Sequence, residues 1–307
     1  AAFPVPGTPQ LRAYVTIMQG CDNFCSYCIV PSVRGRERSR TSQEILTEIE
    51  ALIRRGAKEV ILLGQNVNSY AKNEPCELTF PQLLAKIDEI PGLERIRFTT
   101  SHPKDLTEEL IGAYGTLRHL CGHIHLPFQA GSNAVLKRMN RGHTREEYRA
   151  QIQRLREVVP QIGITADVMV GFPGEKEEDF SQTLELMQAV QFDGLFSFKY
   201  SRREGTRAAQ WVDDCALEVK QRRLAVLQAS QRKITLEKNK TLEGTIQEVL
   251  VEGHSRNSPH TMMGRTRCNR IVNFPGESDL AGALVLVRID HGLQNSLRGE
   301  LYKREET

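Results

Sequence analysis

Short runs of apolar and β-branched residues alternate with amphipathic helical stretches from residue 13 to about residue 200. This alternation predicts repeated βα units around a parallel sheet, because two neighbouring parallel strands need a helix-length connection. The strand segments are almost continuously hydrophobic, which is typical of strands covered on both faces. We therefore expect an α/β domain with six strands, which are Ala13–Met18, Glu59–Leu63, Arg95–Thr99, His123–Leu126, Ile164–Val170 and Gly194–Lys199.

Two helix starts can be placed from local spacing. Thr41 precedes Glu44 by three residues, and Thr144 precedes Glu147 by three residues, each just before an apolar stripe of helical period. This is the spacing of a capping box, in which the two side chains each accept a hydrogen bond from a backbone N–H of the first turn. We expect helices to begin at both sites and to pack their apolar stripes on the sheet.

The pattern of the chain changes after Trp211. A long helix is expected from about Ala216 to Asn239, serving as a connector. Its apolar side is expected to hold Leu217, Leu224 and Leu227, with Lys220, Arg222, Arg223, Arg232 and Lys233 elsewhere. From Leu242 to Tyr302, short apolar runs separated by polar turns predict a small all-β unit.

Three of the seven cysteines fall within eight residues, directly after the first expected strand. They are Cys21, Cys25 and Cys28, whereas Cys76, Cys121, Cys215 and Cys268 are scattered singly. Zinc would need a fourth ligand and usually a second cysteine pair, and three thiols on one tight loop cannot all form disulfides. Four-iron clusters are bound by cysteine thiolates, and three ligands leave one iron open. The spacing therefore favours an iron–sulfur cluster.

The motif Cys-x3-Cys-x2-Cys, with Tyr27 just before the last cysteine, resembles the signature of radical S-adenosylmethionine (SAM) enzymes. The resemblance implies a partial (β/α)6 barrel similar to part of a TIM barrel. It also implies that Cys21, Cys25 and Cys28 bind three irons of a 4Fe-4S cluster, while the fourth iron chelates SAM. One electron then cleaves SAM to methionine and a 5′-deoxyadenosyl radical, which the protein must orient and shield from water.

Polar segments follow most of the expected strands. They are Gly64–Asn68, Thr100–Pro103, Pro127–Ser132, Gly171–Glu175 and Tyr200–Thr206. In parallel βα folds, ligands bind at the carboxyl ends of the strands. A single segment of this kind is often only a turn, but a series after successive strands favours one shared ligand site.

Four of these sequences also resemble the methylthiotransferase branch of radical-SAM proteins: Gly-Gln-Asn-Val-Asn, Leu-Pro-Phe-Gln-Ala-Gly-Ser, Gly-Phe-Pro-Gly-Glu and Tyr-Ser-x-Arg-x-Gly-Thr. The resemblance implies that the cavity for SAM and substrate is lined by Tyr27, Gln65, Asn66, Gln129, Ser132, Asp167, Gly171, Tyr200 and Arg203. Its glycines would let the cofactor approach the backbone. Hydrogen-atom abstraction needs no acid or base, so no catalytic residue is assigned and His102 is interpreted as structural or binding.

A stretch without acidic residues runs from Gly253 to Phe274. On a small β-barrel it is expected to form a basic patch suited to phosphates and single strands, made by Arg256, Arg265, Arg267 and Arg270. Its second half, Gly264–Phe274, resembles the TRAM domain found at the tail of these enzymes, with Cys268 as a small buried residue or free thiol. A second basic run, Arg34–Arg40, is interpreted either as a solvated face or as a guide for a polyanion.

The family resemblance covers nearly the whole chain and implies its division. Residues 1–12 are expected to be a linker, 13–210 the radical-SAM core, 211–241 a connecting helix and 242–304 a TRAM RNA-binding domain. Family members begin with a further domain that holds a second 4Fe-4S cluster on three more cysteines, and we expect this domain to be missing from the chain. We expect this chain to bind one cluster and cleave SAM without completing sulfur insertion.

The family that the sequence resembles most attaches a methylthio group to carbon 2 of isopentenyladenosine beside the anticodon in tRNA. The implied partners are the tRNA anticodon stem-loop and a reducing electron donor such as flavodoxin or ferredoxin. Three alternatives stay open: a sister family acting on threonylcarbamoyl-adenosine in tRNA, another acting on a ribosomal-protein aspartate, and an RNA-binding module with a structural cluster. No run of about 18 apolar residues is present to span a bilayer, so we expect a cytoplasmic protein without membrane contact.

Overall fold

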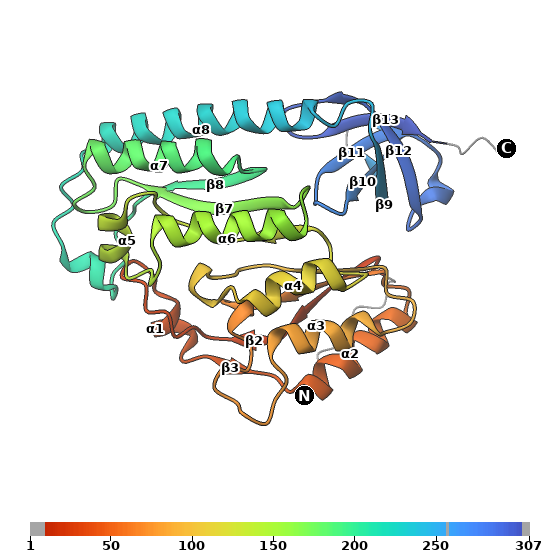
Figure 1. Ribbon diagram of the computed structural model, residues 1–307, viewed down its shortest axis with the longest axis horizontal. Helices are drawn as coiled ribbons and strands as arrows, with labels where there is room; N and C mark the ends of the chain where they lie inside the picture. Colours follow the sequence, from red (N-terminus) through yellow and green to blue (C-terminus); the bar gives the residue numbers. More distant parts are fainter. Residues whose placement is uncertain (1–9, 256–257, 303–307) are drawn as a thin grey trace.

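The computed structural model describes residues 10–255 and 258–302. Figure 1 shows a large unit of strands and covering helices, with the long helix α8 (Leu217–Lys240) along its upper edge and a small barrel of strands at its right-hand end. The large unit holds the apolar core of the α/β part, and the small barrel has a core of its own.

Six parallel strands build the large unit as two sheets of three. The first sheet has the order β1 (Arg12–Thr16), β4 (Glu59–Leu63), β5 (Arg95–Phe98), and the second has the order β6 (His123–His125), β7 (Gly163–Val170), β8 (Gly194–Lys199). All pairs within the two sheets are parallel. A parallel bridge between Ile96 and Leu120 joins the sheets next to β6. The strands follow chain order around a partial (β/α)6 barrel, which confirms the predicted fold class.

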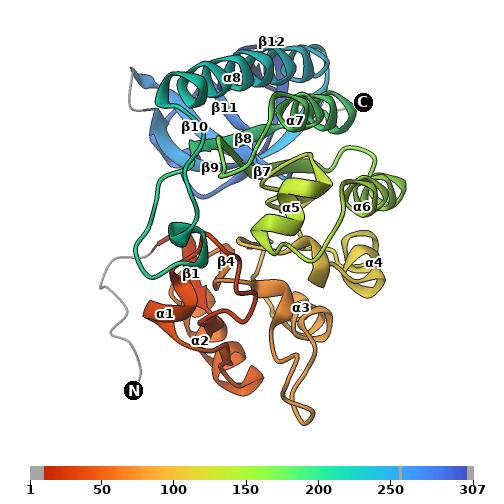
Figure 2. The ribbon, with the colours of Figure 1, turned by 90° about the vertical axis from the view of Figure 1, so that its left-hand side faces the viewer.

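Helices cover the outer side of these strands, as Figure 2 shows from one end of the molecule. They are α2 (Ser42–Arg54), α3 (Phe80–Asp88), α4 (Glu108–Thr116), α6 (Arg145–Val158) and α7 (Glu177–Val190), with shorter helices α1 (Val30–Arg34) and α5 (Asn133–Met139). Short 3-10 turns lie at Val67–Ser69, Pro103–Asp105 and Arg207–Gln210. Thr41 and Thr144 each form a complete capping box, so both predicted helix starts are confirmed.

The first expected strand is divided in the structure. β1 ends at Thr16, and β2 (Met18–Gln19) turns aside to pair antiparallel with β3 (Arg38–Ser39). The prediction of one strand from Ala13 to Met18 is therefore wrong at its carboxyl end. Ile17 and Met18 remain fully buried after the parallel pairing stops, and for that reason the apolar run outlasts the strand.

Helix α8 packs against β8 and α7, and its apolar side differs from the prediction. Leu217 is exposed, whereas Lys220 and Arg223 are buried. Lys220 Nζ lies 2.6 Å from Asp213 Oδ2, and Arg223 Nη1 lies 3.0 Å from Glu175 Oε1. A buried charge is tolerated when it is paired, and these partners lie outside the helix, so helical periodicity does not reveal them.

The carboxyl-terminal part is a closed five-stranded barrel. Its strands are β9 (Ile246–Ser255), β10 (Ser258–Thr266), β11 (Ile271–Pro275), β12 (Leu284–Gly292) and β13 (Leu297–Leu301), in the order β10-β11-β13-β12-β9, with a 3-10 turn at Ser278–Leu280. Val249, Val251, Met262 and Phe274 are among its buried core residues. The small all-β unit predicted from the sequence is confirmed.

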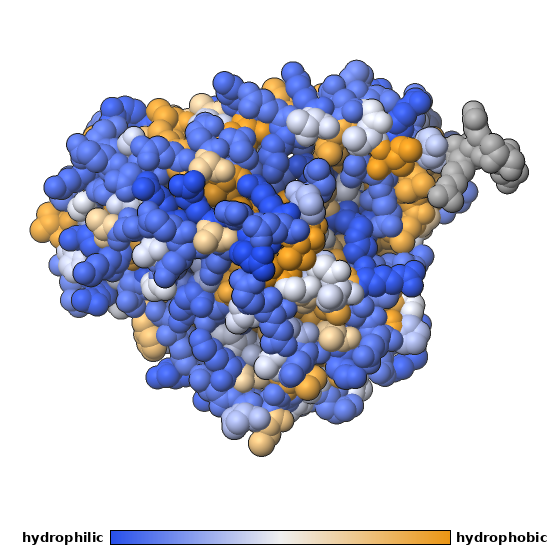
Figure 3. Space-filling view, in the orientation of Figure 1, coloured by the Kyte–Doolittle hydropathy of each residue, from blue (hydrophilic) through white to orange (hydrophobic). Residues whose placement is uncertain are grey.

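Hydrophilic side chains cover most of the face shown in Figure 3, with separate hydrophobic patches between them. Within the described residues, none of the helices combines the length and apolarity needed to cross a bilayer.

Candidate functional site

The inner face of the partial barrel is set by the alternation of side chains along β7. Ala166 and Val168 pack in the core under the helices, so Asp167 between them points into the barrel. Phe196 of β8 pairs with Asp167, and Phe198 shares its face of the strand. These two rings are 60% and 52% exposed, and large apolar exposure of this kind is typical of a binding surface.

His125 adds a polar group to the same inner face. Its Nε2 lies 3.4 Å from Asp167 Oδ1, and its ring stands edge-on to Phe196 with 5.8 Å between the ring centroids. The other ring nitrogen, Nδ1, lies 3.1 Å from Thr165 Oγ1. The middle of the barrel therefore offers two exposed aromatic rings beside a histidine–aspartate pair.

The three cysteines lie on residues 20–28, which we call the cysteine loop. This loop begins directly after β2 and is held by hydrogen bonds on two sides. Gly20 has φ of +79°, and a Cβ there would lie 2.1 Å from Arg36 O, so only glycine fits this turn. Gly20 N donates to Gln65 Oε1 over 2.7 Å, which ties the loop to the carboxyl end of β4. At the other side, Ser26 Oγ donates to Arg138 O over 2.9 Å. These bonds fix the loop before any ligand binds.

The three thiols differ in exposure. Cys25 is buried, whereas Cys21 and Cys28 are partly exposed. Burial raises the pKa of Cys21 and of Cys28, and the neighbouring cysteine thiols raise both pKa values further. The loop thus gathers three sulfurs closely enough to interact electrically.

This donor set fits a 4Fe-4S cluster better than a single ion. Among the described residues, no three His, Cys, Asp or Glu side chains are placed to hold one metal ion. In a cubane each thiolate binds a different iron, so its ligands stand farther apart than those of one ion. Cys25 Sγ also accepts a hydrogen bond from Arg141 Nη1 over 3.4 Å, as a thiolate ligand would.

Asn66 occupies the same end of the barrel as the thiols. It is 2% exposed, and its Nδ2 donates to Asp105 Oδ2 over 2.8 Å. Its Oδ1 is buried without a hydrogen-bond partner in the described part of the chain. Buried acceptors are nearly always paired in proteins, so this atom marks a place where a ligand donor fits.

Tyr27 and Tyr200 meet around one phenylalanine. The ring of Phe172 stands edge-on to both, at centroid distances of 6.3 Å from Tyr27 and 5.3 Å from Tyr200. Burial raises the pKa of both tyrosines. The structure therefore brings the loop and the carboxyl ends of β7 and β8 together through aromatic contacts.

Gln129 and Arg203 stand at two further strand ends. Gln129 has φ of +67°, and its backbone bonds to Asp167 O and Met169 N, which extends the pairing of β6 with β7. Arg203 is exposed after β8, and its charge partly offsets the rise that burial causes in the pKa of Cys28. Both residues lie where the sequence predicts a ligand rim.

Two predicted cavity residues, Ser132 and Gly171, make structural contacts in the protein. Ser132 is 1% exposed, caps α5 and donates its hydroxyl to Asp179 Oδ1. Gly171 has φ of +70°, and a Cβ there would lie 2.3 Å from Lys220 Cγ. The structure thus shows a close approach of Lys220 that requires glycine at this position, and a contact of Gly171 with the cofactor stays a prediction.

Sequence reasoning missed four residues of the site: His125, Arg141, Phe196 and Phe198. The period-2 pattern of β8 carried a signal, since Phe196 and Phe198 alternate with Ser197 on a strand at the edge of the sheet. Arg141 gave none, because its contact with Cys25 joins positions 116 residues apart.

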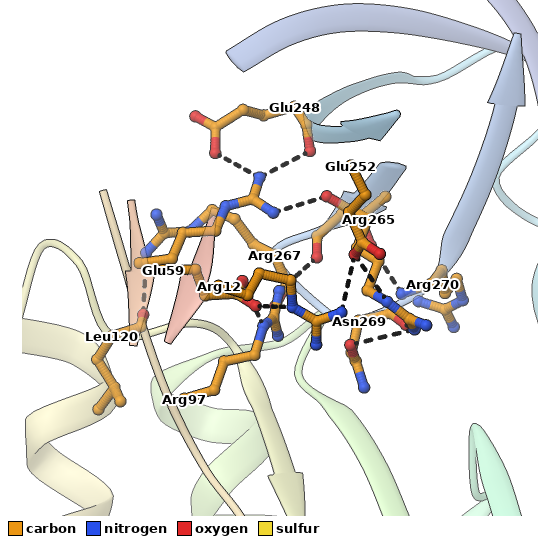
Figure 4. Close-up of polar contacts among 12 residues, drawn as sticks. Arg12, Glu59, Arg97, Leu120, Glu248, Glu252, Arg265, Arg267, Asn269 and Arg270 are labelled. Atoms are coloured by element: carbon orange, nitrogen blue, oxygen red, sulfur yellow. Dashed lines mark hydrogen bonds and ion pairs between the residues drawn. The ribbon is translucent and has the colours of Figure 1, made fainter. Parts of the chain in front are cut away.

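The arginines expected to bind RNA lie at the opposite end of the barrel. Arg267 Nη2 donates to Arg118 O and Leu120 O over 2.8 and 2.9 Å, and Arg265 Nε lies 3.0 Å from Glu252 Oε1 (Figure 4). These side chains therefore join the small barrel to the large unit or pair within the small barrel.

The side chain of Arg270 is also occupied by contacts within the protein. It forms an ion pair with Asp193, and its Nε donates to Asn239 Oδ1 over 3.0 Å. The expected open basic patch thus differs from the structure: Arg267 and Arg270 are held by partners from distant segments, and Arg265 is held by Glu252 and Asn269 within the small barrel. Arg256 lies outside the described residues.

The contact region between the small barrel and the large unit closes the amino-terminal end of the parallel strands, and we call it the floor of the barrel. Arg95 and Arg97 of β5 donate to carbonyl oxygens of residues 265–267 over 2.6 to 3.0 Å. Arg97 Nε also pairs with Glu59 Oε2 over 2.8 Å, with both side chains almost fully buried. Figure 4 shows the side chains of Glu59 and Arg97 close to Arg267, which lies in the turn between β10 and β11.

A cavity of about 400 Å³ lies beside this floor. Its lining includes Thr165 and Gly194 near the amino ends of β7 and β8, together with Gln228 and Gln231 of α8. The thiols lie at the carboxyl ends of the strands, so this cavity and the cysteine loop occupy opposite ends of the barrel.

Comparison with known proteins agrees with this arrangement. The model of the radical SAM superfamily matches residues 15–187, and that of the TRAM domain matches residues 240–302. The "tRNA-2-methylthio-N(6)-dimethylallyladenosine synthase" of Syntrophus aciditrophicus is 55% identical over 301 residues, covering 98% of this chain and 65% of the relative. The synthase of the same name from Geotalea uraniireducens is 54% identical over 300 residues, covering 97% of this chain and 68% of the relative.

The chain belongs to the radical SAM superfamily, in the same family as these synthases. This radical SAM protein spans 65% of the length of its Syntrophus relative. Solved structures share its fold at low identity. Coproporphyrinogen III oxidase (HemN) from Escherichia coli has a TM-score of 0.52 at 15% identity, covering 85% of this chain and 67% of that chain. The methyltransferase TsrM from Kitasatospora setae has a TM-score of 0.53 at 17% identity, covering 77% and 42%.

Proposed function

We propose that this protein methylthiolates carbon 2 of isopentenyladenosine (N6-dimethylallyladenosine) in tRNA by radical SAM chemistry. The observation that carries the proposal is the fixed loop of three thiols at the carboxyl ends of the strands, next to an open aromatic inner face. Relatives at 54–55% identity bear the corresponding synthase name. Threonylcarbamoyl-adenosine in tRNA and a ribosomal-protein aspartate are the alternative substrates to be tested.

Cys21, Cys25 and Cys28 would hold a 4Fe-4S cluster. When bound, the cluster supplies the electron that converts SAM to methionine and a 5′-deoxyadenosyl radical. Asn66, with its unpartnered Oδ1, and Gln65, Gln129 and Arg203 at the strand ends are proposed to bind and orient SAM. The residues of the loop and rim act by binding and by excluding water, so no residue is assigned as an acid or base.

The substrate base is proposed to lie on the inner face of β7 and β8. Phe196 and Phe198 present exposed rings, and every base has a π-face that stacks on an aromatic side chain. Asp167 and His125 stand beside these rings at a spacing of 3.4 Å between their polar atoms. Their polar atoms are suited to the hydrogen-bonding edge of an adenine, next to the radical source.

The TRAM barrel is proposed to contribute contacts to the tRNA anticodon stem-loop. Arg267 and Arg270 hold the barrel against the rest of the chain and Arg265 pairs within it, so the RNA contacts are assigned to the outer surface of the barrel and to Arg256. A one-electron donor such as flavodoxin or ferredoxin, and a cytoplasmic location, belong to the same proposal. The cysteine loop provides for one cluster in this chain, and sulfur insertion by the whole protein is proposed to use a second.

The test begins with anaerobic reconstitution using iron and sulfide. Dithionite-reduced protein is incubated with SAM and an anticodon stem-loop that carries deuterium on carbon 2 of isopentenyladenosine. We expect 5′-deoxyadenosine that contains deuterium, because abstraction precedes sulfur insertion. Cys25→Ala should give no 5′-deoxyadenosine. A fully loaded wild-type protein that leaves SAM intact would overturn the proposal.

The choice of substrate needs a second arm of the same assay. Stem-loops with threonylcarbamoyl-adenosine or unmodified adenosine, each deuterated at carbon 2, replace the isopentenyl substrate. We expect deuterium transfer mainly from the isopentenyl stem-loop. Transfer mainly from the threonylcarbamoyl stem-loop would assign the protein to the sister reaction.

A further inference from the structure

Arg141 stands in the turn between α5 and α6, just after the cap residue Asn140. Asn140 has φ of +57°, and Arg141 N donates to Leu136 O over 3.0 Å, so the turn closes α5 tightly. The Arg141 side chain is drawn inward, and the residue is 5% exposed. The orientation of the Arg141 side chain is therefore set by its packing inside the protein.

The guanidinium bridges the barrel rim and the cysteine loop. Arg141 Nη2 donates to Pro127 O over 2.8 Å, and Nη1 donates to Cys25 Sγ over 3.4 Å. Nε is buried without a partner among the described residues. A planar fork held at one end by a carbonyl presents its other end at a fixed angle, which here is toward the buried sulfur.

No carboxylate in the described part of the chain compensates this cation. Within residues 10–255 and 258–302, none of the ion pairs includes Arg141. The nearby rings of His102 and His143 stand edge-on to each other, 5.7 Å apart, and burial lowers the pKa of both, so both are neutral. A buried charge without a partner is strongly unfavourable. The acidic groups that interact with Arg141 include the thiols of Cys25 and Cys21, which would carry negative charge as thiolates once they bind iron.

We propose that Arg141 raises the reduction potential of the cluster held by Cys21, Cys25 and Cys28, by donating a hydrogen bond to the Cys25 sulfur. The inference rests on the proposed function only in requiring that a cluster binds there. Hydrogen bonds to ligand sulfurs and nearby positive charge stabilise the reduced, more negative cluster over the oxidised one. Arg141 acts through Cys25 and does not touch SAM or the base.

The proposal gives Arg141 a role that is separate from substrate binding. Reduction adds one electron from the donor to the cluster, and the potential decides how much of the protein is reduced at a given donor potential. A lower potential in the absence of Arg141 leaves less protein able to cleave SAM. The effect is therefore visible without RNA.

The test is a redox titration followed by electron paramagnetic resonance of anaerobically reconstituted protein. Arg141→Gln removes the charge, and Arg141→Lys keeps the charge but loses the planar fork. Arg149→Gln, at an exposed position on α6, is the matched control. Iron content and SAM affinity are measured for every variant, so that loss of the cluster is not mistaken for a shifted potential.

We expect Arg141→Gln to lower the ratio of reduced to oxidised cluster about tenfold at a fixed potential, which corresponds to about 59 mV for one electron. Arg141→Lys should fall between this variant and wild type, and Arg149→Gln should match wild type. If Arg141→Gln does not load iron, Arg141→Lys decides the question by the same titration.

Three results would overturn the inference. A loaded variant with the wild-type potential would show that Arg141 is only structural. Unchanged potential with greatly weakened SAM affinity would make it a SAM ligand. A wild-type protein that binds no cluster would overturn the proposed function together with this inference, whereas the first two results leave the proposed function standing.

Discussion

Arg97 pairs with Glu59 across β4 and β5 at 2.8 Å, where both side chains are shielded from solvent. The remaining nitrogens of Arg97 donate to carbonyls of the TRAM turn at 3.0 and 2.8 Å. Arg97 therefore joins β5 to β4 through its pair with Glu59 and also fastens the TRAM barrel to these strands.

Loss of this pair should destabilise the protein severely. Breaking a buried ion pair by removing one partner costs about 3–5 kcal/mol, since the other charge is left buried and unpaired. We expect Glu59→Gln to lower the free energy of unfolding by an amount in this range, measured by urea denaturation. As a control, Glu50→Gln disrupts the exposed pair with Arg54 and should cost at most about 1 kcal/mol. Equal losses of stability in the two variants would contradict the conclusion that the buried Arg97–Glu59 pair stabilises the protein.

Gly20 should be essential for loading the cluster. Its φ is +79°, and a Cβ on this residue would lie only 2.1 Å from Arg36 O, which leaves no space for alanine. We expect Gly20→Ala to contain much less iron after reconstitution while keeping its helical circular dichroism. Gly112→Ala, at a helical glycine whose Cβ would meet no atom within 4 Å, should load normally. Full iron loading of Gly20→Ala would show that the loop does not depend on this turn.

Phe196 should matter for the modified base and not for SAM. Stacking of a base on an aromatic side chain contributes about 1–3 kcal/mol, so Phe196→Ala should weaken binding of the isopentenyl stem-loop by about fivefold to 150-fold. Cleavage of SAM without RNA should remain. Val212→Ala changes a highly exposed apolar residue and should bind RNA like wild type. Unchanged stem-loop affinity in Phe196→Ala would place the base elsewhere.

Acid should destabilise the fold through His143. Burial, and then the nearby Arg141 charge, lower the pKa of His143 to about 4 from an ordinary 6.5. The unfolded chain therefore binds the proton first, and stability is lost as the pH falls from about 6.5 to about 4, by up to about 3 kcal/mol. His143→Gln should show a flatter pH dependence of urea unfolding over this window. The exposed His254 provides the control, and His254→Gln should keep the wild-type slope.

Local sequence rules predicted the parts of the fold that depend on neighbouring residues. β4 and β8 have the expected bounds, and the capping boxes at Thr41 and Thr144 start their helices as expected. The spacing of the three cysteines predicted one loop that carries all three thiols, and the structure has this loop directly after β2. These features are encoded within a few residues, so a single sequence suffices to find them.

The contacts of the arginines were not predictable in this way. The sequence predicted that Arg267 and Arg270 belong to a free basic patch. Their partners, which are backbone carbonyls and Asp193, come from distant segments and are not visible in the local sequence. Lys220 was predicted to lie in solvent for the same reason. In the structure its ammonium group pairs with Asp213, and its chain packs against Gly171, where a side chain would leave no space. Charge in a sequence shows what a side chain carries, whereas tertiary contacts decide whether it reaches solvent.

The floor of the barrel also bears on how the chain is made. Arg97 and its carbonyl partner at Arg267 are 170 residues apart, and contacts of such long separation form slowly because a large loop must close first. During synthesis from the amino terminus, the parallel strands emerge before the segment that completes their base. Until residues 265–267 leave the ribosome, the guanidinium groups of Arg95 and Arg97 can bond only to water in place of the carbonyls of these residues. The end of the barrel farthest from the cysteine loop is therefore completed last.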